Sequence, residues 1–160
     1  LSTSIKERPL PNSSKILEVT SEDICIANLE IKNYDGALVP CQVSLSSISK
    51  NGRGYSLEVY GSEGSIFLKS ENQKDYVHGF NLMFSDKEDN KYNLHADSLF
   101  NFEKTWTDGR IAPVKRIQKL WAISIINQIP VIPGLAEGLR SQRVCEAIRK
   151  SSESGINIKI

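Results

Sequence analysis

Apolar and polar residues alternate in several segments of the first hundred positions, and this pattern predicts a series of β-strands. The alternation is clearest in Tyr55–Tyr60 and resumes in Ser65–Lys69. Between these segments, Gly61-Ser62-Glu63-Gly64 supplies the glycines that a tight reversal with positive φ angles needs. The sequence therefore predicts a β-hairpin over this region.

Further strands are predicted by the same criteria. They cover Ile24–Lys32, Ala37–Ile48, Tyr76–Phe84 and Tyr92–Leu94. Ile24–Lys32 is apolar on both faces, as is typical of a central strand, whereas Ala37–Ile48 has one polar face. Asn33-Tyr34-Asp35-Gly36 and Asn51-Gly52 mark turns, and such short connections imply antiparallel pairing.

After Trp106 the apolar positions recur at helical spacing. One helix is predicted from Pro113 to Gln128 and a second from Glu137 to Ser152, with Gly155 placed to end it. Ile156–Ile160 alternates again and predicts a final strand. Strands followed by helices predict an α+β fold, an open and mainly antiparallel β-sheet with helices packed on one face, in a single domain over residues 1–160.

Composition narrows the function classes. The chain has 160 residues and a formal net charge of +1, which gives the whole molecule no electrostatic reason to bind nucleic acid or an anionic membrane. Residues 1–102 carry 10 basic and 14 acidic side chains, and residues 103–160 carry 10 and 5. The basic helical segments are typical of a solvated face, and few aromatic residues lie near them, so nucleic-acid binding is disfavoured.

Three cysteines, an odd number, argue against a disulfide framework and favour a reducing compartment. A short turn at residues 33–36 would leave Cys25 and Cys41 about three to five residues out of alignment, roughly 10–16 Å apart and beyond the ~7 Å limit for bridging. There is no apolar run of membrane-spanning length and no signal peptide at the start, so a cytoplasmic protein is expected. The chain begins at Leu1, which leaves room for a missing upstream domain.

Few residues form a pattern that suggests a cofactor, metal or catalytic site. Gly52-Arg53-Gly54 opens a strand instead of a helix, so it lacks the helix N-terminus that a dinucleotide fingerprint uses, and no cofactor site is expected in this chain. His78 and His95 have no second histidine or cysteine at metal-ligand spacing, which argues against a metal site. No catalytic residue is predicted.

Trp106 and Arg110 lie in the polar link between the last strand and the first helix. A tryptophan and a nearby arginine in a loop suit one wall of a binding site, although the commoner role of a tryptophan such as Trp106 is to anchor the loop to the core. By elimination, these two residues are the candidates for substrate binding.

Three segments carry a resemblance to a known family. They are Ser21-Glu22-Asp23 before a long strand, the hairpin segment Leu57–Ile66, and the ending that runs from Glu137-Gly138-Leu139-Arg140 to Gly155–Ile158. In order and spacing they resemble the carboxy-terminal domain of the Gfo/Idh/MocA oxidoreductases. Glu103-Lys104 is similar to the catalytic Glu-Lys-Pro motif of that family, but Thr105 replaces the proline and the position follows the sheet, so Lys104 is assigned no role.

The resemblance implies a sheet similar to the carboxy-terminal domain of glyceraldehyde-phosphate dehydrogenases, with an N-terminal Rossmann domain in the parent protein that binds NAD or NADP. It also implies a sugar, cyclitol or related polyol as substrate, and a homo-oligomer formed through the sheet. Hydride transfer would belong to the parent protein, and this fragment alone is expected to be inactive. The alternative is a non-enzymatic interaction module that receives a protein partner on its exposed sheet face.

Overall fold

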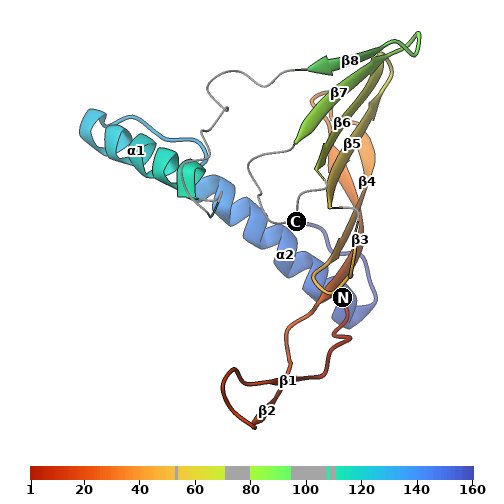
Figure 1. The fold of residues 1–160 in the computed structure, drawn as a ribbon. Coiled ribbons are helices and arrows are strands. Elements are labelled where there is room, and N and C mark those ends of the chain that lie inside the picture. Colours follow the sequence, from red (N-terminus) through yellow and green to blue (C-terminus); the bar gives the residue numbers. More distant parts are fainter. Residues whose placement is uncertain (53, 71–79, 95–107, 109–110) are drawn as a thin grey trace. The chain divides into compact units, whose positions relative to one another are not determined.

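A computed structural model describes residues 1–52, 54–70, 80–94, 108 and 111–160 (Figure 1). These residues form open antiparallel sheets and two helices, which confirms the predicted α+β class. The chain divides into two compact units, one made of residues 1–50 and 132–160 and the other of residues 51–131.

The first unit contains two separate two-stranded sheets. Strands β3 (Ile24–Lys32) and β4 (Leu38–Ser46) pair antiparallel over nine residues each. Their turn is closed by Asn33, whose side-chain oxygen accepts a hydrogen bond from Ala37 N at 2.8 Å. Gly36 follows with a φ of 81°, a conformation that glycine adopts without steric cost.

The β3–β4 register sorts side chains onto two different faces. One face carries the apolar or small side chains of alternate positions: Cys25, Ala27, Leu29, Ile31, Val39, Cys41, Val43 and Leu45. Cys25 lies opposite Leu45, four residues beyond Cys41, which confirms the misalignment predicted from the turn. Both thiols are free, and so is that of Cys145.

A small hairpin that the sequence patterns did not predict precedes β3. Strands β1 (Glu7–Pro9) and β2 (Ile16–Glu18) have three residues each and pair antiparallel. Segments this short give too few alternating positions for a periodicity to be detected.

The second unit contains a four-stranded antiparallel sheet in the order β5-β6-β7-β8. The strands are β5 (Tyr55–Gly61), β6 (Gly64–Ser70), β7 (Asn81–Asp86) and β8 (Lys91–Leu94). Gly61 pairs with Gly64 across a two-residue turn, so the hairpin that the alternation predicted is confirmed. Only Gly64 of these two glycines has a positive φ, at 152°.

Both predicted helices are confirmed, with bounds that differ from the predicted ones by one or two residues at each end. Helix α1 spans Ile111–Asn127 in the second unit, with Pro113 in its first turn, where a missing N–H leaves no hydrogen bond unmade. Helix α2 spans Leu135–Ser154 in the first unit. At its start the Glu137 carboxylate accepts the Gly134 N–H at 2.8 Å, and at its end Gly155 adopts a φ of 70° and donates its N–H to Ser151 O.

Three predictions about strands were wrong. Ile156–Ile160 alternates but forms no strand, because no described segment pairs with it. Strand β3 is not central, because among the described residues it pairs only with β4 and through a single bridge from Ser2 to Ile24. Asn51-Gly52 does not make a hairpin, because β4 and β5 belong to different sheets, although Asn51 does adopt a positive φ of 54°.

The strand predicted over Tyr76–Phe84 lies partly outside the described residues, which omit 71–79. Where the structure describes it, β7 begins at Asn81 and continues two residues past Phe84. Its pairing with β8 extends through Ser85, which lies opposite Lys91. The expected alternation holds, since Leu82 and Phe84 lie on the same face of the sheet.

No described hydrophobic side chain is fully buried. Asp23, at 6% exposure, and Ser70, at 1%, are the buried polar residues of the described part of the chain. The apolar faces of the sheets and helices are half-buried or exposed, so a large apolar area stays open to solvent within each unit.

Candidate functional site

The candidate substrate residues Trp106 and Arg110 lie outside the described residues. The same holds for His78, His95 and Lys104. The structure therefore leaves the predicted substrate-binding pair untested.

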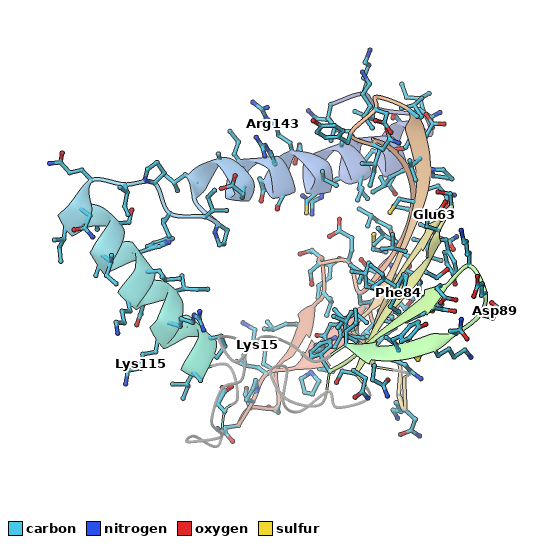
Figure 2. All side chains as sticks on the ribbon, turned by 90° about the horizontal axis from the view of Figure 1, so that it is seen from above. Lys15, Glu63, Phe84, Asp89, Lys115 and Arg143 are labelled. Carbon is cyan, nitrogen blue, oxygen red and sulfur yellow. The ribbon has the colours of Figure 1, made fainter. Side chains whose placement is uncertain are left out.

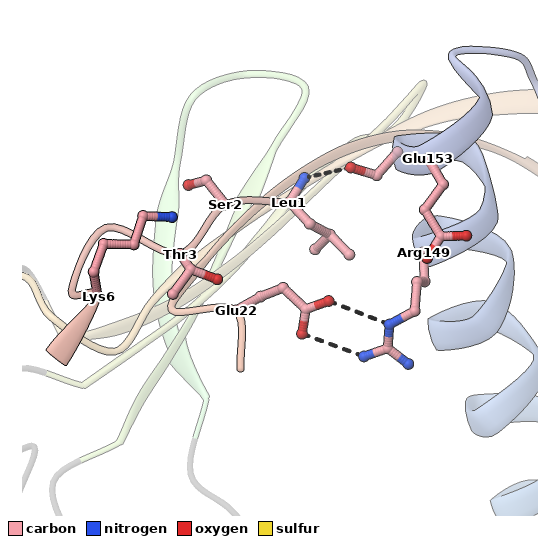
Figure 3. Close-up of a pocket in the computed structure, with 8 residues that line it drawn as sticks. Leu1, Ser2, Thr3, Lys6, Glu22, Arg149 and Glu153 are labelled. Carbon is pink, nitrogen blue, oxygen red and sulfur yellow. Dashed lines mark hydrogen bonds and ion pairs between the residues drawn. The ribbon is translucent and has the colours of Figure 1, made fainter. Parts of the chain in front are cut away.

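A pocket of about 380 Å³ lies in the first unit, between the N-terminal segment and the last turns of α2 (Figure 3). Its lining is rich in charged and hydroxyl side chains and consists of Leu1, Ser2, Thr3, Lys6, Glu22, Arg149, Ser152 and Glu153. Glu22 comes from the corner before β3, and Arg149 comes from α2, far along the chain.

Glu22 and Arg149 form a bidentate ion pair at the pocket (Figure 3). Arg149 Nε donates to Glu22 Oε1 at 3.2 Å, and Nη2 donates to Oε2 at 3.3 Å. This pairing lowers the pKa of the Glu22 carboxyl and raises the pKa of the Arg149 guanidinium, because each charge stabilises the other. Both side chains keep partial contact with solvent, which weakens the attraction.

Asp23, the next residue, fastens the N-terminal segment to the start of β3. Its carboxylate accepts the N–H of Ser4 at 2.9 Å and that of Ile5 at 2.9 Å. These backbone hydrogen bonds hold the pKa of Asp23 below its usual value, and the bond from Ile5 contributes more than the bond from Ser4. Asp23 N also donates to Ser2 O at 3.0 Å, so side chain and backbone make one junction.

The chemistry of this pocket favours a structural role. A carboxylate with a lowered pKa that is already paired with a guanidinium is a weak general base near neutral pH. Arg149 is likewise compensated by Glu22, and by Glu146 at 4.0 Å, so it offers little net charge to an anionic ligand. The residues instead join the N-terminal segment, the corner at Glu22-Asp23 and α2.

The sequence patterns do not predict this junction. Glu22 and Asp23 contribute only to the family resemblance, and Arg149 lies in one of the basic helical segments that are typical of a solvated face. Glu22 and Arg149 are separated by 127 positions, and nothing local in either segment indicates the other.

The described residues do not fit a nicotinamide dinucleotide. Such a cofactor places its pyrophosphate on a glycine-rich turn at a helix N-terminus. Helix α1 opens with Ile111-Ala112-Pro113-Val114, which contains no glycine. The first turn of α2 is occupied by the Glu137 carboxylate, which would repel a phosphate.

Within the described part of the chain, no group of three or more histidine, cysteine, aspartate or glutamate side chains is arranged to hold a metal ion. No helix among the described residues is long and apolar enough to cross a membrane.

The β5–β8 sheet provides a second feature, an apolar face that we call the sheet face. The pairing register places these side chains on it: Tyr55, Leu57, Val59, Ile66, Leu68, Leu82, Phe84, Tyr92 and Leu94. Leu57 and Val59 are 59% and 52% exposed. Figure 2 shows Phe84 on the sheet and Glu63 and Asp89 on turns at its end.

The opposite face of the same sheet is more polar. It carries Ser56, Glu58, Tyr60, Ser65, Phe67, Lys69, Asn81, Met83, Ser85, Lys91 and Asn93. Tyr60 packs edge-on against Phe67 with ring centroids 5.9 Å apart, and its hydroxyl donates to Glu58 at 2.6 Å. This hydrogen bond raises the pKa of Tyr60, because the neighbouring carboxylate disfavours a second negative charge.

The antiparallel sheets and two helices form an α+β fold, which is consistent with a C-terminal α/β domain. Residues 3–160 match the model of the oxidoreductase family, C-terminal alpha/beta domain, and the chain belongs to the Gfo/Idh/MocA family. It is 36% identical over 154 residues to an uncharacterized oxidoreductase of Synechocystis sp.. That alignment covers 96% of this chain and 40% of the relative, so the chain spans less than half of the relative's length. No solved structure matches the chain significantly.

Proposed function

We propose that this chain is the substrate-binding and oligomerisation domain of an NAD(P)-dependent oxidoreductase that acts on a sugar, cyclitol or related polyol. An N-terminal Rossmann domain of the parent protein would bind the nicotinamide cofactor and carry out hydride transfer. Membership of the family supports this assignment. The free cysteines fit the reducing conditions of the cytoplasm, where we place the parent protein.

The exposed sheet face is the observation that carries the oligomerisation part of the proposal. Side chains such as Leu57, Val59 and Ile66 are 42–59% exposed in a continuous apolar surface built by four strands. Surfaces of this kind usually contact another protein surface, since leaving them in water is unfavourable. A second copy of the chain is the partner we propose, through an isologous contact of the two sheet faces.

The substrate would lie against the link that contains Trp106 and Arg110. An arginine offers paired N–H donors to hydroxyl oxygens, and an aromatic ring packs on the apolar face of a sugar ring. In the full protein, replacing Trp106 with alanine should raise KM for the polyol more than it lowers kcat, as expected for a residue that binds the substrate throughout the reaction.

Nucleotide titration tests the enzymatic part. The full protein that carries this domain is mixed with increasing NADH or NADPH, and the nicotinamide fluorescence is followed. Saturable binding by the full protein, together with no binding by the 160-residue chain, supports the proposal. If the full protein binds neither nucleotide, the oxidoreductase assignment fails and the interaction module becomes the better account.

Light scattering coupled to size-exclusion chromatography tests the oligomer independently. Leu57→Glu places a charge on the sheet face and should weaken self-association at least roughly tenfold, which corresponds to about 1.4 kcal/mol. Ser56→Glu is the matched control, because it adds the same charge one residue away on the opposite face of the same strand. Equal effects of the two substitutions, or none from either, would remove the sheet face as the interface.

A further inference from the structure

Asn51-Gly52 begins the second compact unit, directly after one of the two points where the chain passes between the units, at Lys50 and Asn51. It is the one Asn-Gly pair in the sequence. Both residues are exposed, and Asn51 adopts a left-handed φ of 54°. The pair forms no hairpin turn, so the structure gives it no role in strand pairing.

We infer that Asn51-Gly52 is a site of spontaneous modification, where the asparagine cyclises to a succinimide and then opens to aspartate or isoaspartate. In the first step the Gly52 amide loses its proton to a solvent base, and its nitrogen forms a bond to Asn51 Cγ. The Cγ–Nδ2 bond breaks and ammonia leaves. In the second step, water adds to either carbonyl of the ring and opens it, so no oxidant, reductant or enzyme is needed.

The local structure meets the requirements of the first step. The attacking nitrogen must be free of a hydrogen bond, and the structure gives none for Gly52 N or the Asn51 side chain among the described residues. Gly52 has no side chain to obstruct the approach, and glycine tolerates the backbone angles that ring closure requires. The site lies outside regular structure, where the backbone can rearrange at low cost.

Other described positions with similar sequence lack one of these conditions. Asn12 also has a left-handed φ, of 60°, but its neighbour Ser13 uses its N–H to bond Leu10 O at 3.1 Å. Asp35-Gly36 could form the same ring by loss of water, but Gly36 N donates to Asn33 O at 3.1 Å.

Two further asparagines are held by their side chains. The Asn33 oxygen accepts the Ala37 N–H at 2.8 Å, and the Asn90 amide donates to Asp86 at 3.0 Å. The structure therefore ranks Asn51 ahead of Asn12, Asn33 and Asn90.

The modification would change the chain at a defined place. Each product carries a new negative charge, and isoaspartate also adds one carbon to the backbone path. Because Asn51 is the first residue of the second unit, both changes fall at one of the two points where the chain passes from one unit to the other. This inference does not rest on the proposed function.

Peptide mapping by mass spectrometry tests the inference on the full protein. The protein is incubated in mildly alkaline buffer, which speeds the loss of the amide proton, and samples are digested at intervals. The peptide that contains Asn51 should convert first to two chromatographically separate products, both with the mass change of amide replaced by hydroxyl. The peptide that contains Asn12 should remain intact over the period in which the Asn51 peptide loses most of its original form.

Two substitutions provide the matched comparison. Asn51→Gly keeps a residue suited to positive φ and should abolish the conversion, while Asn12→Gly should leave it unchanged. Circular dichroism of each variant checks that it is folded. Conversion at Asn12 as fast as at Asn51, or an unmodified Asn51 after other asparagines have reacted, would overturn the inference.

Discussion

Strands β6 and β7 approach each other closely at Gly64 because glycine has no Cβ. A Cβ added there would lie 2.2 Å from the backbone oxygen of Ser85 and 2.9 Å from the ring of Phe84, both on the neighbouring strand β7. Real Cβ contacts stay beyond 3.0 Å, so β6 and β7 would have to separate by 0.8 Å or more at this point. The φ of 152° is a further obstacle for any residue with a side chain.

We expect Gly64→Ala to destabilise the second unit by about 2–4 kcal/mol, because a backbone clash and an unfavourable φ each cost about 1–3 kcal/mol and relaxation relieves part of both. The ring of Phe84 can rotate, but the carbonyl of Ser85 belongs to the ladder and cannot move without loss of hydrogen bonds. The clash with the oxygen therefore dominates.

Substitutions at two other glycines distinguish the cost of the steric clash from the cost of the positive φ. Gly36 has a positive φ of 81° and nothing within 4 Å of an added Cβ, so Gly36→Ala should cost only about 1 kcal/mol. Gly138 lies inside α2, also with nothing within 4 Å, and Gly138→Ala should stabilise by about 0.5–1 kcal/mol.

Hydrogen exchange during urea denaturation is the appropriate assay, because it reports on each unit separately. Protection of the amides in β5 and β6 should fall in Gly64→Ala and stay unchanged in the other two variants. If Gly64→Ala and Gly36→Ala proved equally costly, the close approach of Ser85 would carry no energetic weight and the reasoning would be refuted.

Two further predictions concern the junction in the first unit. Asp23→Asn should lower the urea midpoint of unfolding at neutral pH, and the difference from the parent chain should shrink in acid. The pKa of Asp23 is lower in the folded chain than in the unfolded chain. The stability that the ionised carboxylate contributes is therefore complete above the ordinary pKa of aspartate, and it is lost as the pH falls through the pKa of the folded chain. A midpoint difference that does not change with pH would contradict this. In a double-mutant cycle, Glu22→Gln and Arg149→Met should show a favourable coupling energy that declines as salt is added, because the pair is partly exposed. Arg143→Met, on the same helix, is the control and should show no coupling with Glu22→Gln. A coupling energy that does not change with salt would count against an ionic interaction.

Much of the local structure follows from the sequence. Alternation in Tyr55–Tyr60 and Ser65–Lys69 predicts the β5–β6 hairpin because a strand presents successive side chains to opposite faces. Helical spacing together with Pro113 and Gly155 predicts α1, α2 and the end of α2, since these residues act through their own backbone angles. Such effects operate over a few positions and need no information about the rest of the chain.

Only the tertiary structure decides which segments far apart in the sequence pair or contact each other. Ile156–Ile160 has the pattern of a strand but no neighbour, and a strand exists only where a second segment supplies hydrogen bonds. The pairing of Glu22 with Arg149, 127 positions away, depends on how α2 meets the start of β3. Gly64 likewise looks like an ordinary turn residue in the sequence, and the carbonyl of Ser85 that excludes a side chain there becomes its neighbour only when β6 and β7 pair.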